Sequence, residues 1–298
     1  MFTQPPCCPN PDCARHTDGA KGFYERRGTF RTKHDRRRVP RYRCKTCGRW
    51  FNSRTFNATA GQHRPEVNRP IRDMICSGMS MRRVARVLCV AKTTVEARVR
   101  WLADQSRKAH DRFLAAPPEK TSYVQIDELE TYEHSSLKPL SIALAVRAKT
   151  GQIIDARVAS MNCHGVMASI SRKFYGKRAD TRKEAFAQVL GSVGKVAKPK
   201  VTIATDARCV YRPLIKEVIP GAVHKAHVQP KKKGRLAAKT SILKRWDPLY
   251  RLNQTAAKLR ADISRLARKT WSASKRAARL QDHLAIYIAF NNGYELVL

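Results

Sequence analysis

Acidic residues are scarce in this sequence, and long apolar runs are absent. Its 298 residues contain 23 Asp and Glu against 60 Lys and Arg, which gives a formal net charge of +37. No globular core needs such an imbalance, so the composition favours a polyanionic partner, of which nucleic acid is the commonest. No apolar stretch reaches the roughly eighteen residues of a membrane span. The start, MFTQPPCCPN, also lacks the pattern of a signal peptide. We therefore expect a soluble intracellular protein.

The nine cysteines are unevenly spread, because five of them lie in the first 47 residues. Cys8 and Cys13 form one close pair, and Cys44 and Cys47 form a second, followed by a glycine that permits a tight turn. In a reducing compartment this spacing predicts four thiolates around one structural zinc ion. Cys7 or His16 replacing one of these ligands is an alternative. We assign residues 1–60 to a zinc ribbon, whose basic segment between the pairs would follow a phosphate backbone.

The pattern of residues 61–114 is helical. A first helix ends near Gly78, a second starts after Ser80, and a longer basic helix follows the break CVA. This order predicts a DNA-binding helix-turn-helix, and a plain three-helix packing unit is the alternative. Two prolines in residues 115–120 then mark a linker. The candidate groove-facing residues are Lys92, Thr93, Thr94 and Arg98.

Residues 121–298 alternate strand and helix patterns. Three successive strand candidates are SYVQIDELETYEH, PLSIALAVRAKTG and QIIDARVAS; a helix, a fourth strand, another helix and the strand GAVHKAHV follow. This order predicts an α/β fold with a ribonuclease-H-like catalytic domain. In that topology the first and fourth strands are neighbours.

Asp127 lies in the first of these strands, and Asp206 ends the fourth, KVTIATD. Two carboxylates that share one site repel each other unless cations neutralise them. We therefore predict a catalytic site for two Mg²⁺ or Mn²⁺ ions at Asp127 and Asp206, suited to phosphodiester hydrolysis and strand transfer. His224 and His227 are further candidates near this edge. Alternative acids are Glu128, which points to the other face of a regular strand, Glu130 and Asp155.

A third ligand is expected from a helix near the C-terminus. Asp247 and Pro248 read as a helix start, which argues against Asp247 as a catalyst. At 100° per residue, Asn253 and Arg260 share one flank of this helix, and Asp262 lies on the other flank. The helix is expected to run for about five turns. Its apolar stripe consists of Leu249, Leu252, Ala256, Leu259, Ile263 and Leu266.

Three segments carry a family resemblance: IDELETY, TDARCVY and above all RLNQTAAKLRADISRLARKTWSASK. They resemble the transposases of insertion-sequence family one, over most of the chain and in order. That resemblance implies a D-D-E type catalytic domain behind a zinc ribbon and a helix-turn-helix. It places the two acids at Asp127 and Asp206, the family's glutamate at Asn253 and a basic residue at Arg260. An amide oxygen can bind a metal but adds no charge, so we expect the second ion to be held weakly.

The resemblance implies a cytoplasmic, nucleoid-associated DNA transposase. It would cut and join strands at the terminal inverted repeats of an insertion sequence, acting on double-stranded DNA as a homodimer or a larger assembly, with no membrane partner. One rival interpretation is a non-catalytic DNA-binding regulator derived from a transposase. Another is a structure-specific nuclease, which would cut without joining.

Overall fold

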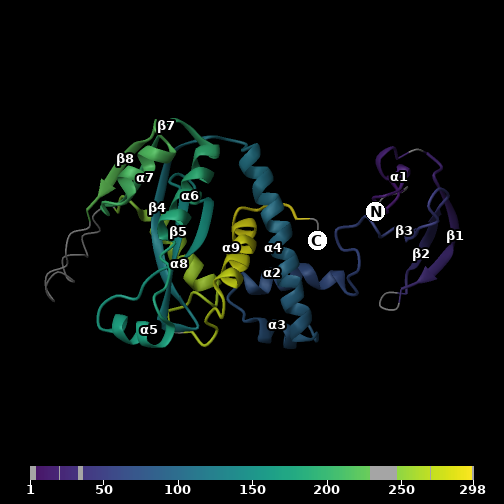
Figure 1. Cartoon of the computed structure of the whole chain (residues 1–298), viewed down its shortest axis with the longest axis horizontal. Coiled ribbons are helices and arrows are strands. Elements are labelled where there is room, and N and C mark those ends of the chain that lie inside the picture. Colours follow the sequence, from purple (N-terminus) through teal and green to yellow (C-terminus); the bar gives the residue numbers. More distant parts are fainter. Residues whose placement is uncertain (1–4, 20, 33–35, 229–246, 269, 297–298) are drawn as a thin grey trace. The chain divides into compact units, whose positions relative to one another are not determined.

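The computed structural model describes residues 5–19, 21–32, 36–228, 247–268 and 270–296 (Figure 1). The chain divides into two compact units, one up to Arg69 and one from Pro70 to Leu296. The lysine-rich residues 229–246 lie outside the described residues. No described helix has both the length and the apolar character needed to cross a membrane. The domain limits drawn from the sequence, at residues 60, 114 and 120, stay predictions.

The first unit is a small three-stranded antiparallel sheet with little apolar core. Its sheet has the order β1-β2-β3. The core is an aromatic cluster beside the buried cysteines, in which Phe23 stacks on Phe51 at 6.1 Å between ring centroids. The elements of this unit are α1 (Ala14–Thr17), β1 (Tyr24–Arg31), β2 (Arg38–Cys44), β3 (Trp50–Asn52) and the 3-10 helix η1 (Pro65–Val67).

Three helices follow in the expected order: α2 (Asn68–Ile75), α3 (Met81–Val87) and α4 (Lys92–Ala115). Gly78 makes the turn after α2 with φ +79°, where a side chain would be strained. Ser80 is the N-cap of α3, as predicted, but its side chain makes no capping hydrogen bond. α4 buries the predicted apolar face and packs beside α9 (Ala277–Asn291), as Figure 1 shows.

The second sheet is mixed and contains the five predicted strands. Its order is β6-β5-β4-β7-β8, so the first and fourth strands are neighbours as expected. β4, β5 and β6 pair antiparallel, whereas β7 and β8 run parallel to β4. The strands are β4 (Thr121–Glu133), β5 (Ser135–Arg147), β6 (Ile153–Ser160), β7 (Ala197–Asp206) and β8 (Val223–His227).

Helices cover both faces of this sheet. Val124 and Ile126 of β4 share one core with α6 (Arg182–Val196) and α7 (Tyr211–Val218). Successive strand residues point to opposite faces. Gln125 therefore faces the other way, and there it binds the start of α8 (Tyr250–Asp262). The short helix α5 (Met167–Tyr175) packs on β5.

α8 is shorter than the sequence predicted, because it ends at Asp262. Continuing the helix would require the Asp262 carbonyl to bond four residues ahead, but it accepts the N–H of Gly78 instead (2.7 Å). Ile263 is extended, yet its side chain and that of Leu266 remain buried. Most of the predicted apolar stripe is therefore buried, but its last two residues, Ile263 and Leu266, lie beyond the end of the helix.

α9 hydrogen-bonds the outer edge of β6 through two of its amide side chains. Gln281 accepts from the N–H of Val158 and donates to the carbonyl of Ala156, each at 2.9 Å. At the C-cap of α9, Asn292 accepts from the N–H of Ile153 (3.1 Å) and donates to its carbonyl (2.7 Å). These bonds satisfy backbone groups on the edge of β6 that faces no other strand of the described residues.

Gln125 is only 4% exposed, and its amide donates to the Pro248 carbonyl (2.7 Å) and accepts from the Leu252 N–H (2.9 Å). We predict that Gln125→Leu lowers the free energy of unfolding by about 2–4 kcal/mol, because two backbone groups lose their buried partner. Urea unfolding would measure the change. Gln254→Leu is the control. Among the described residues its amide bonds only the Arg251 side chain, and an effect within about 0.5 kcal/mol is expected. Equal effects of the two variants would contradict the anchoring role.

Candidate functional site

Four cysteines of the first unit converge on one point. The Sγ atoms of Cys8, Cys13, Cys44 and Cys47 all lie within 4.8 Å of one another. Cys8 Sγ is 3.5 Å from Cys47 Sγ, and Cys13 Sγ is 3.9 Å from Cys44 Sγ. Zinc–sulfur bonds of about 2.3 Å in a tetrahedron place the sulfurs about 3.8 Å apart. The four thiolates predicted from the sequence can therefore hold a metal ion such as zinc.

Local backbone structure brings the two cysteine pairs together. Gly48, with φ +71°, donates its N–H to the Cys44 carbonyl (3.0 Å) and closes the turn after Cys47. His16 does not belong to the cluster of close ligand atoms, and its Nδ1 donates to the Cys8 carbonyl (2.7 Å). Cys7 is also outside the cluster. The alternatives left open by the sequence therefore give way to the four cysteines.

The thiols of this cluster differ in acidity. The backbone N–H of Arg49 lowers the pKa of Cys47 to about 7. Burial raises the pKa of Cys8 to about 12. Cys47 is exposed and Cys8 is buried, so the first deprotonated ligand offered to an incoming cation is Cys47.

The second cluster is the pair Asp127 and Asp206. The parallel ladder of β4 and β7 pairs Gln125 with Ala204, and two residues further along both strands Asp127 comes level with Asp206. β8 continues this row, because Asp206 pairs with His227. The structure thus brings the two predicted acids together at one edge of the sheet.

The acid pair carries an electrostatic cost. Burial raises the pKa of Asp127 to about 6, and the charge of Asp206 acts in the same direction. The N–H of Glu128, which donates to Asp127 Oδ1 (2.7 Å), and the Arg208 guanidinium act against this rise. A cation between the carboxylates would offset both the burial of the Asp127 charge and its repulsion from Asp206. The residues therefore fit a divalent metal.

The start of α8 lies on the Asp127 face of the sheet, because Gln125 binds it there. Asn253 is exposed, and its amide donates to Asp247 Oδ2 (2.8 Å). Asp247 Oδ1 accepts the N–H of Leu249 (2.9 Å). Asp247 was expected to be the N-cap, but the helix begins later, with Leu249 in that position. Asp247 and Asn253 therefore form a hydrogen-bonded pair at the start of α8.

The other two candidates on α8 lie farther along the helix. Asp262 is about 13 Å from Asn253 along the axis, and its carboxylate accepts the Tyr287 hydroxyl (2.6 Å). Arg260 is half-buried, and burial together with Arg268 lowers its pKa. Among the described residues, no carboxylate pairs with Arg260. Asp262 is thus placed as a structural residue, whereas Arg260 keeps an uncompensated charge.

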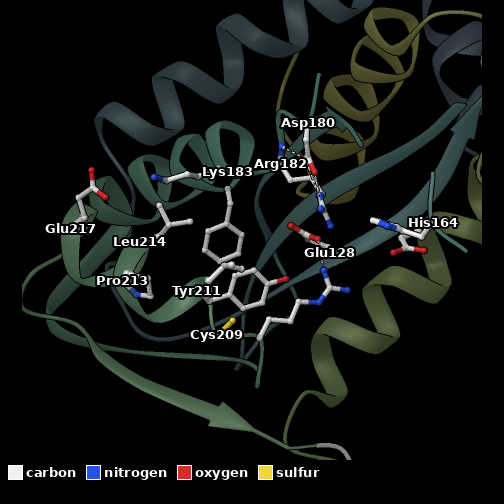
Figure 2. Close-up of a pocket in the computed structure, with 14 residues that line it drawn as sticks. Glu128, His164, Asp180, Arg182, Lys183, Cys209, Tyr211, Pro213, Leu214 and Glu217 are labelled. Carbon is white, nitrogen blue, oxygen red and sulfur yellow. Dashed lines mark hydrogen bonds and ion pairs between the residues drawn. The ribbon is translucent and has the colours of Figure 1, made fainter. Parts of the chain in front are cut away.

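The alternative acids lie elsewhere. Asp155 is buried on β6, where it accepts from Ser192 Oγ (2.6 Å) and Arg157 Nε (3.0 Å). Glu128 and Glu130 line a cavity of about 760 Å³ on the α6–α7 face, opposite Asp127 (Figure 2). Figure 2 shows Glu128 between Arg182 and the ring of Tyr211. The strand alternation predicted for Glu128 is confirmed.

Each candidate histidine has a different environment. His224 Nε2 lies 2.8 Å from Thr205 Oγ1 and is engaged within the sheet. His227 is level with Asp206, and its Nε2 is buried without a hydrogen-bond partner among the described residues. His227 is therefore the better placed of the two.

The groove-facing candidates occupy the first turns of α4. Lys92 and Thr93 are exposed, and Thr94 and Arg98 are half-buried. Lys92 Nζ lies 2.9 Å from Glu96 Oε1, an exposed pair that is easily exchanged for another anion.

Two functional neighbours were missed from the sequence. Gln125 anchors α8, and Arg208 contacts Asp206. In the sequence they are marked only by position: a glutamine stands two residues before one predicted acid, and an arginine stands two residues after the other.

We predict that Cys44→Ser abolishes stoichiometric zinc binding by the purified full-length chain, because it removes a buried ligand of a four-coordinate site. Loss of metal should also unfold the first unit, whose aromatic core is small. Metal content by mass spectrometry and near-ultraviolet circular dichroism would report both effects. Cys7→Ser, which changes the residue next to Cys8, should bind zinc like the wild type. Zinc loss in both variants would contradict the ligand set.

We predict that Asp127→Asn stabilises the protein at pH 7.5 by about 1–3 kcal/mol. The pKa of Asp127 is about 6 in the folded protein, against an ordinary aspartate value of 3.8, which applies to the unfolded chain. Between these values the folded protein binds a proton that the unfolded chain has released, so stability falls as pH rises. The gain should therefore shrink towards zero near pH 4. Urea unfolding without added divalent cations would test this, with the exposed Asp104→Asn as control; a gain independent of pH would refute it.

No protein-family model matches the chain, and no curated protein matches it significantly.

Proposed function

We propose that the chain is a DNA transposase that cuts and joins strands at the terminal inverted repeats of an insertion sequence. The observation that carries this proposal is the nearness of Asp127 and Asp206, which lie two residues beyond the last paired residues of the neighbouring parallel strands β4 and β7 and act on each other electrostatically. The sheet order β6-β5-β4-β7-β8 supports a ribonuclease-H-like domain, the type expected from the sequence resemblance. The basic segments of the sequence and the net charge of +37 suit a DNA substrate.

Asp127 and Asp206 would hold Mg²⁺ or Mn²⁺, with the Asn253 oxygen as a weaker third ligand. When bound, the metal supplies an activated oxygen nucleophile and stabilises the leaving oxygen at a phosphodiester. Asp247 orients the Asn253 amide through its hydrogen bond, which leaves the amide oxygen available. Arg260 would contact the phosphate, because a half-buried cation without a carboxylate partner favours an anion.

DNA recognition would come from the N-terminal part of the chain. The zinc ribbon would follow the phosphate backbone, and α2 to α4 would form a helix-turn-helix. Its exposed Lys92 and Thr93 stand at the start of the longest helix, where recognition helices contact bases. Joining two element ends requires a homodimer or a larger assembly.

The regulator hypothesis is favoured by one observation: Asn253 adds no charge, and its amide is hydrogen-bonded to Asp247. Under that hypothesis the chain binds the repeats without cutting them.

The cutting activity is tested with a supercoiled plasmid that carries the DNA flanking the gene. The wild type should nick the repeat ends when Mg²⁺ or Mn²⁺ is present. Asp206→Asn should lose at least about 100-fold in rate, because a neutral amide holds the cation poorly. Glu130→Gln, an exposed acid facing away from the pair, is the matched control and should cut normally.

Specific binding to the repeats without any cutting would contradict the transposase proposal and support the regulator hypothesis. Cutting without preference for the repeats, and without strand joining, would identify a nuclease.

A further inference from the structure

Arg208 links two carboxylates that belong to different faces of the sheet. Its Nη1 lies 2.6 Å from Glu128 Oε2, and its Nε lies 3.3 Å from Asp206 Oδ2. Its backbone N–H also donates to Asp206 Oδ1 (3.3 Å). One guanidinium therefore joins the acid pair to the cavity on the α6–α7 face.

The two contacts are unequal. The Glu128 side chain is 6% exposed, whereas that of Asp206 is 24% exposed and the longer contact goes to Asp206. Glu128 needs the guanidinium more than Asp206 does, because fewer water molecules reach it. The Arg208 guanidinium is therefore held mainly by Glu128.

A divalent cation at the acid pair would draw on the same carboxylate that Arg208 contacts. If Asp206 Oδ2 binds a metal, its contact with the guanidinium is weakened. The metal ion and the guanidinium also repel each other, because both are positively charged. The contact would contribute little to stability on its own, since the Arg208 side chain is 39% exposed. The main effect of the Arg208–Asp206 contact is to reduce the negative charge available to an incoming divalent cation.

We infer that Arg208 is an internal counter-ion of the acid pair that competes with the divalent cation for Asp206, and that Glu128 weakens this competition by holding the guanidinium. Arg208 is therefore a positioning residue. The inference deepens the proposed function and rests on the metal site at Asp127 and Asp206.

The inference predicts opposite effects for two neutralising substitutions. Arg208→Gln should tighten Mn²⁺ binding by about tenfold, because the competing charge is gone. Glu128→Gln should weaken it by at least about threefold, because the guanidinium is released towards Asp206. Arg208→Lys keeps a cation and should lie between Arg208→Gln and the wild type. The measurement is Mn²⁺ titration of the zinc-loaded full-length protein without DNA, followed by electron paramagnetic resonance of free Mn²⁺.

Arg182→Gln is the matched control for general charge effects. Arg182 lines the same cavity but pairs with Asp180 (2.7 Å), so its removal should change Mn²⁺ affinity by less than about twofold. Thermal melts identify any variant that fails to fold, and in that case Arg208→Lys against the wild type still decides the direction.

The outcomes separate this inference from the proposed function. Mn²⁺ binding that is lost in Asp206→Asn but shifts in the same direction in Arg208→Gln and Glu128→Gln, or in neither, overturns the counter-ion role alone. Mn²⁺ binding that Asp127→Asn and Asp206→Asn leave unchanged overturns the metal site, and with it both proposals.

Discussion

Parallel pairing between β4 and β7 is the constraint on which the acidic site depends. The two strands are separated by more than sixty residues, yet their ladder puts Asp127 level with Asp206. Bringing like charges together opposes folding, and the apolar cores on both faces of the sheet offset that cost. The sheet is thus a rigid frame that holds two repelling groups at a fixed spacing, which is the pre-organisation that the proposed metal-dependent chemistry needs.

The same arrangement explains why the start of α8 is tied to β4 rather than left as a surface helix. Gln125 is one of few buried polar residues in the sheet, and both of its bonds go to the backbone around Pro248 and Leu252. A glutamine facing an apolar layer would be costly without these partners. Its two hydrogen bonds fix the position of Asn253 and Asp247 along the strand direction relative to Asp127. Packing of apolar side chains alone would fix this position less closely.

Much of the second sheet was predictable because the alternation of β4, the apolar run of β5 and the helix α6 that leads into β7 are strong local patterns. The four cysteines were predictable from spacing. The end of α8 was not, because a tertiary hydrogen bond from Gly78 stops a helix that local periodicity would continue. The Asp247–Asn253 pair and the contacts of Arg208 with Glu128 and Asp206 were also missed. Each depends on side-chain rotamers or on distant partners, about which periodicity carries no information.

The amide contacts of α9 along β6 also limit how copies of the chain can associate. An unpaired strand edge is a natural place for a second molecule to add a strand, which would extend the sheet across two chains. Gln281 and Asn292 already occupy the backbone groups of Ala156, Val158 and Ile153 that such an added strand would need. A strand added at β6 would first have to displace these side chains, so association of two copies is favoured through other surfaces.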